Sequence, residues 1–159
     1  MIAGARAKLV RATPADIPFI MATERRPGYD DLVGRFPQEE HRAYIVDDNW
    51  LYFLGLDERG KAQGFAILQD RNKCDGSEYL RRIAVTDAGK GFGKPFLTAL
   101  IDWVFANTDA TRFWLNVHNN NDRARHVYEQ LGFVSEGPEQ GDERTSTTMA
   151  LAKSVWLAR

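Results

Sequence analysis

The stretch that decides the fold reads Ile83-Ala84-Val85-Thr86-Asp87-Ala88-Gly89-Lys90-Gly91-Phe92-Gly93-Lys94-Pro95. The run from Leu80 to Val85 predicts a strand, and a turn with three glycines in five positions follows it. Pro95 suits the first turn of a helix, where its missing N–H leaves no bond unmade. Beyond it, apolar residues recur in pairs every four residues, as in an amphipathic helix: Phe96, Leu97, Leu100, Ile101, Val104 and Phe105.

The glycine loop suits an anion. Glycines let the backbone approach a ligand closely, and the first turn of a helix presents unpaired N–H groups and the positive end of the dipole. Lys90 and Lys94 add positive charge on either side. The stretch therefore predicts a phosphate cradle, with a tight strand-to-helix turn that binds nothing as the alternative.

Two familiar phosphate motifs are excluded. The pattern G-x-x-x-x-G-K-[ST] fails because Lys94 precedes Pro95 and position 88 is alanine. The pattern G-x-G-x-x-G, started at Gly89, needs glycine at position 94, which is lysine. The loop is therefore neither a P-loop nor a dinucleotide-binding loop.

Composition narrows the class of protein. The 159 residues are 43% hydrophobic and 27% charged, which predicts one soluble globular domain over residues 1–159. A net charge of −1 argues against nucleic acid or an anionic membrane as partner. Cys74 is the only cysteine, so we expect a reducing compartment. No apolar run approaches the roughly 20 residues that span a bilayer, and no signal-peptide core is present, which predicts a cytoplasmic protein.

Local patterns predict a mixed α/β order with an antiparallel front half. Helices are expected after Thr13, after Pro37, at 94–106 and after the stretch from Asn119 to Asp122. Thr13 and that stretch supply caps, and Gly132 ends the last of these helices. Strands are expected at 8–11, 50–56, 64–69, 79–85, 112–118, 133–134 and 145–151.

A second motif makes the chain recognisable. Asn121-x-x-Ala124-x-x-x-Tyr128-x-x-Leu131-Gly132-Phe133 follows the strand–loop–helix unit by about 30 residues. Together the two blocks, over residues 80–134, resemble the GNAT superfamily of N-acetyltransferases. The resemblance implies a central mixed, mostly antiparallel sheet of six to seven strands flanked by about four helices. It also implies a V-shaped gap between the strands ending at Val85 and Val117, which would hold acetyl-CoA.

The resemblance further implies roles for individual residues. The backbone of the strand end would pair with the pantetheine amides, the loop would hold the pyrophosphate, and an asparagine would contact the cofactor arm. The strand end is Ile83, Ala84 and Val85, and the asparagine is Asn121. The loop residues are Gly89, Lys90, Gly91, Phe92, Gly93 and Lys94.

Tyr128 matches the family tyrosine that protonates the leaving thiolate. Transfer from a thioester to an amine needs a neutral amine, a stabilised oxyanion and a protonated leaving group. A tyrosine with a pKa near ~10 keeps its proton at neutral pH and can donate it. The alternative is a core tyrosine, because Tyr128 shares a helix face with Ala124 and Leu131.

Two departures from the family pattern affect this interpretation. Ala88 stands where the family commonly has Gln or Arg, and Asn116 stands where members that acetylate ribosomal protein N-termini often have Glu. Asn116 cannot act as a base, which leaves Glu78 as the best carboxylate candidate for the general base. The alternative is that Glu78 is a solvated residue at the start of the strand. His118 is a second candidate for a proton relay, whereas His41 and His126 are expected on the surface.

The last loop is acidic. We expect it near the acceptor mouth, where it would attract a cationic acceptor such as a polyamine, an aminoglycoside or a peptide N-terminus; a solvated loop is the alternative. Its acidic residues are Glu136, Glu139, Asp142 and Glu143. The larger aromatics read as core or interface residues, because no basic stripe accompanies them: Trp50, Tyr52, Trp114 and Trp156.

The sequence thus predicts an acetyl-CoA-dependent N-acetyltransferase that transfers the acetyl group directly to a primary amine of a small molecule or peptide. No metal is expected, since the three histidines and one cysteine have no ligand spacing. The alternatives are a catalytically silent CoA-binding sensor and a protein-interaction domain. The front hairpin and Trp156 are candidate homodimer surfaces.

Overall fold

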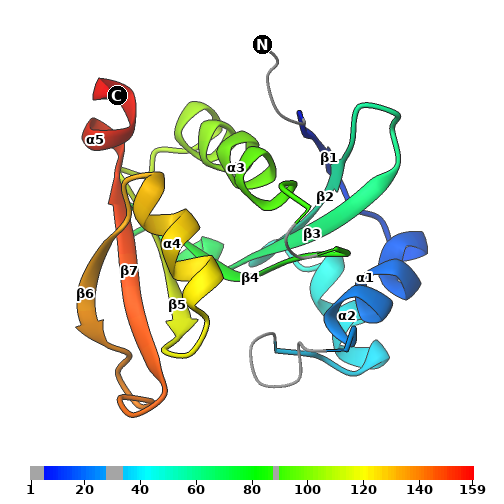
Figure 1. Cartoon of the computed structure of the whole chain (residues 1–159). Coiled ribbons are helices and arrows are strands. Elements are labelled where there is room, and N and C mark those ends of the chain that lie inside the picture. Colours follow the sequence, from blue (N-terminus) through cyan, green and yellow to red (C-terminus); the bar gives the residue numbers. More distant parts are fainter. Residues whose placement is uncertain (1–5, 28–33, 88–89) are drawn as a thin grey trace.

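A computed structural model describes residues 6–27, 34–87 and 90–159. The described strands form a seven-stranded sheet in the order β1-β2-β3-β4-β5-β7-β6 (Figure 1). All neighbouring pairs are antiparallel except β4 and β5, which are parallel. The strands are β1 Lys8–Arg11, β2 Trp50–Leu56, β3 Ala62–Gln69, β4 Ser77–Val85, β5 Arg112–His118, β6 Val134–Pro138 and β7 Ser146–Ala152.

Helices cover both faces of the sheet. They are α1 Ile17–Glu24, α2 Gln38–Ile45, α3 Gly93–Asn107, α4 Asp122–Gln130 and α5 Lys153–Ala158, with short 3-10 turns at Pro14–Asp16 and Arg71–Lys73. Helices α3 and α4 lie on one face, while α1 and α2 lie on the other (Figure 1). The mixed, mostly antiparallel sheet confirms the predicted fold class, and α5 is an addition that the sequence patterns did not indicate.

Apolar burial and a terminating glycine explain how the two helices beside the gap are held. The stripe of α3 is fully buried, with Phe96, Leu100 and Val104 at 0% exposure. Gly132, just after α4, has a φ of +105°, a left-handed conformation that glycine adopts without steric penalty. These features hold α3 and α4 on the sheet with their N-termini beside the ends of β4 and β5.

A β-bulge in β4 decides which side chains face which layer. Ile67 pairs with Arg82 and Leu68 pairs with Leu80, so Arg81 is one residue too many in the ladder. Because side chains alternate along a strand, one extra residue exchanges the two faces beyond it. Leu80 and Ile83 therefore both face the α3–α4 side, and Arg82 faces α1 and α2.

The sheet divides at this bulge. Parallel pairing between β4 and β5 runs from Ser77 with Arg112 to Leu80 with Leu115, and no pair is formed beyond that rung. The strand ends of β4 and β5 therefore part next to the N-termini of α3 and α4. This is the V-shaped gap that the family resemblance implied.

The structure corrects the expectation that His41 lies on the surface. Its side chain is 0% exposed and lies between Glu24 and Tyr52. His126 is exposed, as expected. The sequence pattern could not place His41, because its partners come from α1 and β2.

Within residues 6–27, 34–87 and 90–159, no helix is both long and apolar enough to cross a bilayer.

Candidate active site

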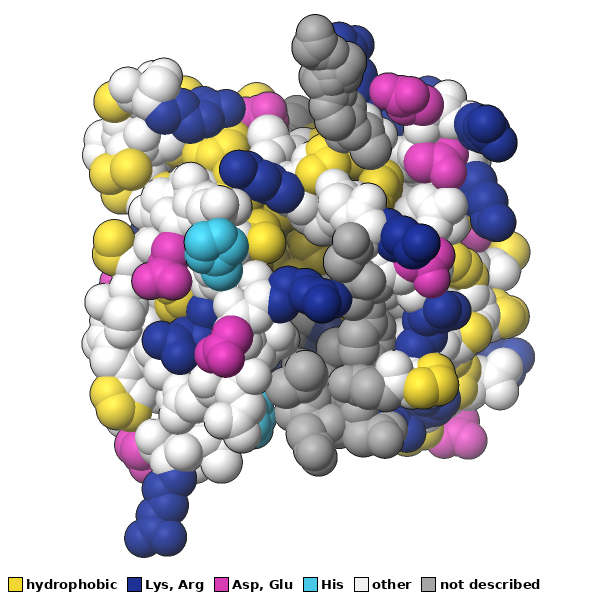
Figure 2. Space-filling view, viewed as in Figure 1, with side chains coloured by type: hydrophobic (Ala, Val, Ile, Leu, Met, Phe, Trp, Pro, Cys, Tyr) yellow, Lys and Arg dark blue, Asp and Glu magenta, His cyan; other side chains and the backbone are white. Residues whose placement is uncertain are grey.

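A cavity of about 410 Å³ opens where β4 and β5 part. Figure 2 shows the surface hollowed between the side carrying α4 and the side carrying α1 and α2, with Lys and Arg side chains around it. The lining comes from β4, β5, α4 and the β6–β7 hairpin: Tyr79, Leu80, Arg81, Arg82, Ile83, Leu115, Asn116, Val117, His118, Asn121, Ala124, Tyr128, Glu139, Asp142 and Ser146, together with Gly34.

The end of β4 presents peptide groups to this cavity. The N–H of Thr86 donates to the carbonyl of Gln63 at 2.8 Å, so Thr86 points its peptide groups toward β3. By the alternation of an antiparallel ladder, Ala84 does the same, while Ile83 and Val85 direct theirs to the β5 side. Of the three predicted cofactor residues here, Ile83 lines the cavity.

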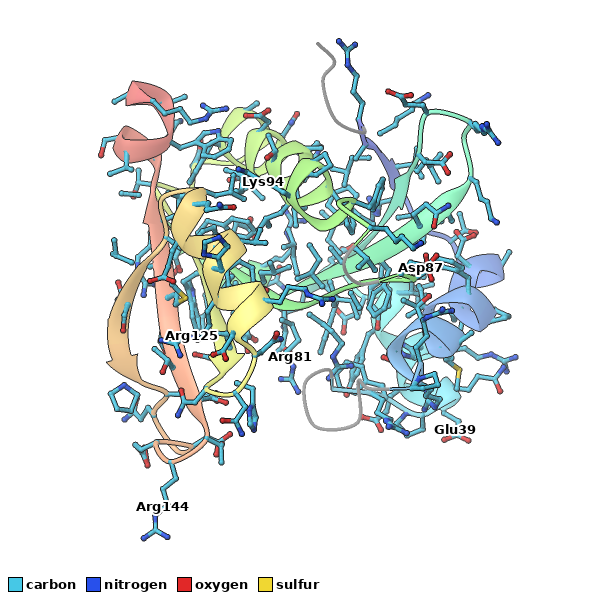
Figure 3. All side chains as sticks on the ribbon, viewed as in Figure 1. Glu39, Arg81, Asp87, Lys94, Arg125 and Arg144 are labelled. Carbon is cyan, nitrogen blue, oxygen red and sulfur yellow. The ribbon has the colours of Figure 1, made fainter. Side chains whose placement is uncertain are left out.

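The loop before α3 has the backbone geometry of an anion site. Gly91 has a φ of +84°, which favours glycine, and Gly93 is the first residue of α3. Phe92 is buried and stacks on Phe96 with ring centroids 5.7 Å apart, so its backbone alone is available to a ligand. Lys90 and Lys94 are exposed, and Figure 3 places Lys94 on α3.

Two loop positions named above, Ala88 and Gly89, lie outside the described residues.

Tyr128 borders the cavity from α4. It is 8% exposed, and its ring lies 5.6 Å from that of Phe133. Burial raises the pKa of Tyr128 to about 12, so the hydroxyl keeps its proton at neutral pH. In the described part of the chain, no group hydrogen-bonds this hydroxyl, and no fully buried side-chain polar atom lacks a partner. The hydroxyl oxygen therefore reaches the cavity surface.

Asn121 caps α4. Its Oδ1 accepts a hydrogen bond from the N–H of Ala124 at 3.3 Å. The capping bond fixes the side chain at the cavity wall, and leaves the amide nitrogen as the group that can reach a ligand.

The β5 wall carries polar side chains without a carboxylate. Asn116 accepts a hydrogen bond from the hydroxyl of Thr148 at 2.5 Å, and its amide lies 3.5 Å from the Tyr79 hydroxyl. His118 accepts from the N–H of Asn120 at 3.1 Å through Nδ1. Because Nδ1 accepts, the neutral ring carries its hydrogen on Nε2, and His118 presents a donor to the cavity.

Glu78 lies away from the cavity. It is buried in β4 where β4 and β5 are still paired, and Arg71 lies 3.4 Å from its carboxylate. It is neither a solvated residue nor one of those that line the cavity. The structure therefore does not bring Glu78 together with Tyr128.

The four acidic residues of the last loop, which is the β6–β7 hairpin in the structure, fall into two groups. Glu139 and Asp142 line the cavity, whereas Glu136 is ion-paired with Arg112 outside it. Glu143 accepts a hydrogen bond from the N–H of Gly141 within the hairpin. Burial, and next the charge of Asp142, raise the pKa of Glu139, while Arg81 acts in the opposite direction.

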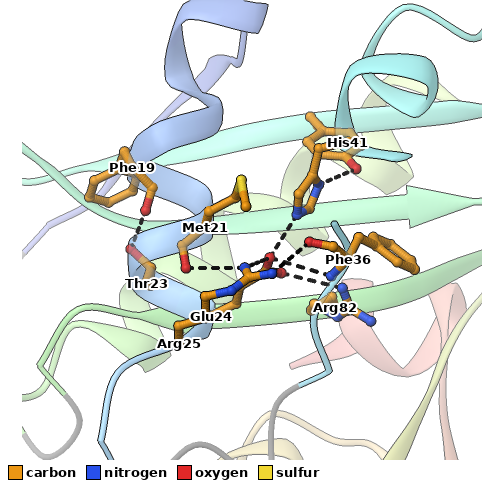
Figure 4. A network of polar contacts seen from close by, with 9 residues as sticks. Phe19, Met21, Thr23, Glu24, Arg25, Phe36, His41 and Arg82 are labelled. Carbon is orange, nitrogen blue, oxygen red and sulfur yellow. Dashed lines mark hydrogen bonds and ion pairs between the residues drawn. The ribbon is translucent and has the colours of Figure 1, made fainter. Parts of the chain in front are cut away.

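The sequence analysis missed a buried polar cluster behind the β4 wall (Figure 4). Glu24 accepts hydrogen bonds from Arg25 at 2.6 Å and Arg82 at 3.4 Å, and lies 2.8 Å from Nε2 of His41. The hydroxyl of Tyr52 lies 2.8 Å from the other ring nitrogen of His41. The available signal was the Arg81-Arg82 pair between apolar residues, in the stretch from Leu80 to Val85.

Within the described residues, no group of three or more His, Cys, Asp or Glu side chains is placed to hold a metal ion.

Known proteins are similar to this chain in sequence and in fold. A 5-NmdU N-acetyltransferase of Pseudomonas phage PaMx11 is 31% identical over 84% of this chain and 91% of its own length. The spermidine N(1)-acetyltransferase of Vibrio cholerae is 26% identical over 69% of this chain, and the match spans 61% of that enzyme. A crystal structure of spermidine N-acetyltransferase from Vibrio cholerae, in complex with CoA and spermine, superposes with a TM-score of 0.81. It is 22% identical, with 96% of this chain and 98% of that chain covered.

The family model described as the acetyltransferase (GNAT) family matches residues 20–133. This is the family that the two sequence motifs predicted, and its enzymes are acetyltransferases. The chain belongs to the GNAT acetyltransferase family.

Proposed function

We propose that the protein is an acetyl-CoA-dependent N-acetyltransferase that acts by direct transfer to a primary amine of a small molecule or a peptide N-terminus. One observation carries the proposal: the protonated hydroxyl of Tyr128 reaches a cavity at the point where β4 and β5 part. Family membership and the names of the relatives support the same reaction class.

The residues present fit acetyl-CoA. The outward peptide groups of Ile83 can pair with pantetheine amides as an added strand would. The first-turn N–H groups of α3, flanked by Lys90 and Lys94, fit a diphosphate. The Asn121 amide is placed to donate to a carbonyl of the cofactor arm. Bound there, acetyl-CoA supplies the thioester whose acyl carbon the amine attacks.

Tyr128 acts as general acid in this proposal. As the amine nitrogen bonds to the acyl carbon and the carbon–sulfur bond breaks, the Tyr128 hydroxyl gives its proton to the sulfur. The proton lost from the amine leaves to water, which the Nε2–H of His118 can orient by donating to it at the cavity wall. Tyr128 is afterwards reprotonated from solvent.

The absence of a carboxylate at Asn116, and the position of Glu78, limit the choice of acceptor. An α-amine with a pKa of ~7.8 is roughly one part in seven neutral at pH 7, whereas a lysine amine at ~10.4 is roughly one part in 2,500. A site with weak base assistance therefore favours an amine of low pKa. In this proposal the acceptor amine loses its proton before it binds, and Glu78 is not the base.

The same missing base favours one alternative, a CoA-binding sensor without turnover. Release of free thiol from acetyl-CoA across a panel of amines separates the two functions. Tight CoA binding without thiol release for any amine would establish the sensor.

Tyr128→Phe tests the enzyme directly. We expect kcat to fall by roughly 10²–10⁴-fold, the range for loss of a general acid. The midpoint of thermal unfolding is expected to change little, because the ring stays in place. Tyr44→Phe is the matched control, since Tyr44 stacks on Trp50 outside the cavity. Full kcat in the Tyr128 variant would contradict the assigned role.

A further inference from the structure

Arg82 places a buried guanidinium in the wall of the cavity. It is 8% exposed, lies over the ring of Phe36 at 4.1 Å, and lines the cavity with Gly34. A Cβ at position 34 would stand 2.3 Å from Nη2 of Arg82, so a glycine there leaves room for the guanidinium. The chain is therefore shaped to keep a cation at this wall.

The cluster behind this wall carries more positive than negative charge. Two guanidiniums, of Arg25 and Arg82, share the single carboxylate of Glu24. Arg25 is the closer of the two, at 2.6 Å against 3.4 Å, and the same carboxylate also lies 2.8 Å from His41. Burial lowers the pKa of Arg82 to about 10, which still leaves it charged at neutral pH. Counting only residues 6–27, 34–87 and 90–159, Arg82 is thus only partly neutralised.

Arg81 adds a second cation to the same wall. As the bulge residue it is exposed, and Figure 3 shows it extending from β4 into the space between the α4 side and the α1–α2 side. Its Nη1 donates to Oε1 of Gln69 at 3.3 Å, a neutral partner. The wall formed by Arg81 and Arg82, called here the arginine wall, therefore carries positive charge that the cluster does not cancel.

The opposite wall is acidic. Glu139 and Asp142 line the cavity from the β6–β7 hairpin, and the charge of Arg81 acts on Glu139 across it. Among the described residues, no ion pair joins Arg81 to either carboxylate, so the two charges face one cavity without cancelling in contact. A ligand carrying one charge of each sign would complement both walls.

We propose that the acceptor is a zwitterionic amine, which carries a carboxylate or phosphate that the arginine wall binds. This inference rests on the proposed acetyl transfer and narrows its acceptor. A polyamine carries cations only, and its positive charges would lie beside the arginine wall. Guanidinium forms paired hydrogen bonds with carboxylate and phosphate, which makes either group a suitable ligand.

The phosphates of CoA do not match this wall on geometric grounds. Arg82 faces α1 and α2, whereas the loop before α3 lies on the other face of the sheet. The test keeps CoA saturating, so that its own phosphate sites are filled.

The test uses pairs of amines that differ in one anionic group. The first pair is β-alanine, which carries a carboxylate, and its amide; the second is O-phosphoethanolamine, which carries a phosphate, and ethanolamine. Spermidine is included as an acceptor that carries cations only. In the wild type, kcat/KM expressed per neutral amine is expected to be about tenfold or more higher for at least one anionic member than for its uncharged partner. The value is expressed per neutral amine because an anionic group raises the pKa of the amine beside it. Comparing the two pairs shows whether carboxylate or phosphate is preferred. A preference for spermidine or for both uncharged members would overturn the inference.

Three variants assign the preference to its residues. Arg82→Met is expected to abolish it, and Arg81→Gln to reduce it severalfold. Arg112→Gln is the matched control and keeps it, because Arg112 pairs with Glu136 outside the cavity. Arg81 is exposed, so its variant tests the wall even when Arg82→Met unfolds. An unchanged preference in Arg81→Gln and in a folded Arg82→Met would also overturn the inference.

Binding separates this inference from the proposed function. Calorimetric titration of each amine into protein saturated with CoA needs no turnover. Turnover without any anionic preference leaves the acetyltransferase standing and removes the zwitterion. Tighter binding of the anionic members without acetylation of any amine supports the zwitterion and removes the acetyltransferase.

Discussion

The two faces of the sheet enclose one cavity but are packed by different chemistry. On the α3–α4 face the core is almost wholly apolar, with Leu100 and Phe113 fully buried. On the α1–α2 face the core includes a carboxylate, an imidazole and a guanidinium, those of Glu24, His41 and Arg82.

We therefore assign the two faces different roles: one positions the groups that the proposed reaction requires, and the other selects the acceptor. Apolar packing holds α3 and α4 in place, and with them the loop and the hydroxyl that the proposed reaction requires. A buried charge is expensive to desolvate, and such clusters are poor sources of net stability. On the α1–α2 face the charges hold Arg82 at the cavity, and we attribute to them the choice of acceptor.

Glu24→Gln should break the polar face most severely. Without the carboxylate, Arg25 and Arg82 lose the charge that they share, and the free energy of unfolding is expected to fall by about 3–5 kcal/mol. Urea denaturation measures the loss. Glu39→Gln, at an exposed position of α2, is the control, with a change below about 1 kcal/mol. A loss below 1 kcal/mol at Glu24 would mean that the cluster does not hold the fold.

Leu100→Ala should damage the apolar face somewhat less. Removing a fully buried leucine leaves a cavity and is expected to lower the free energy of unfolding by about 2–4 kcal/mol. In variant protein kept folded at low temperature, the ratio of kcat/KM values for anionic and uncharged amines should stay as in the wild type. A changed ratio would show that acceptor choice is not confined to the polar face.

The smallest effect is expected in the pH profile of kcat. Burial raises the pKa of Tyr128 to about 12, so its acid form persists while the acceptor amine loses its proton. The rate should rise with pH and show no tyrosine-linked fall below pH ~10. A descending limb near pH 8 that Tyr128→Phe removes would contradict the environment assigned to this residue.

The same raised pKa fixes the sign of its effect on stability. Its contribution is fully present below the unfolded-state pKa of ~10 and is lost as the pH rises toward about 12, because the unfolded chain ionises first. The free energy of unfolding should therefore fall less steeply with rising alkaline pH in Tyr128→Phe than in the wild type.

The layout of the chain was largely predictable from the sequence. Alternation, helix stripes and caps are local signals, and they located the strands β1 to β7 and the helices α1 to α4 of the described residues. The gap and the position of Tyr128 followed from the family motifs, which combine spacing with glycine positions. The placement of Tyr128 at the cavity agrees with that expectation.

What the sequence could not supply depends on contacts between distant residues. Glu24, His41 and Arg82 meet only after α1, α2 and β4 have packed, so nothing local marks His41 as buried. Glu78 was judged from its place near a strand start, and its pairing with Arg71 depends on how the preceding turn folds back. The bulge at Arg81 changes no residue type, only the register.

That single surplus residue has a consequence for how the protein tolerates length changes. Deleting Arg81 would place Arg82 directly after Leu80 and restore a regular ladder with β3, while Ile83 stays on the α3–α4 side and Arg82 keeps facing α1 and α2. Deleting a residue beyond the bulge would instead exchange the faces of the residues that follow it. The length of β4 is therefore constrained beyond Arg81 but not at Arg81 itself, where removing one residue leaves both faces as they are.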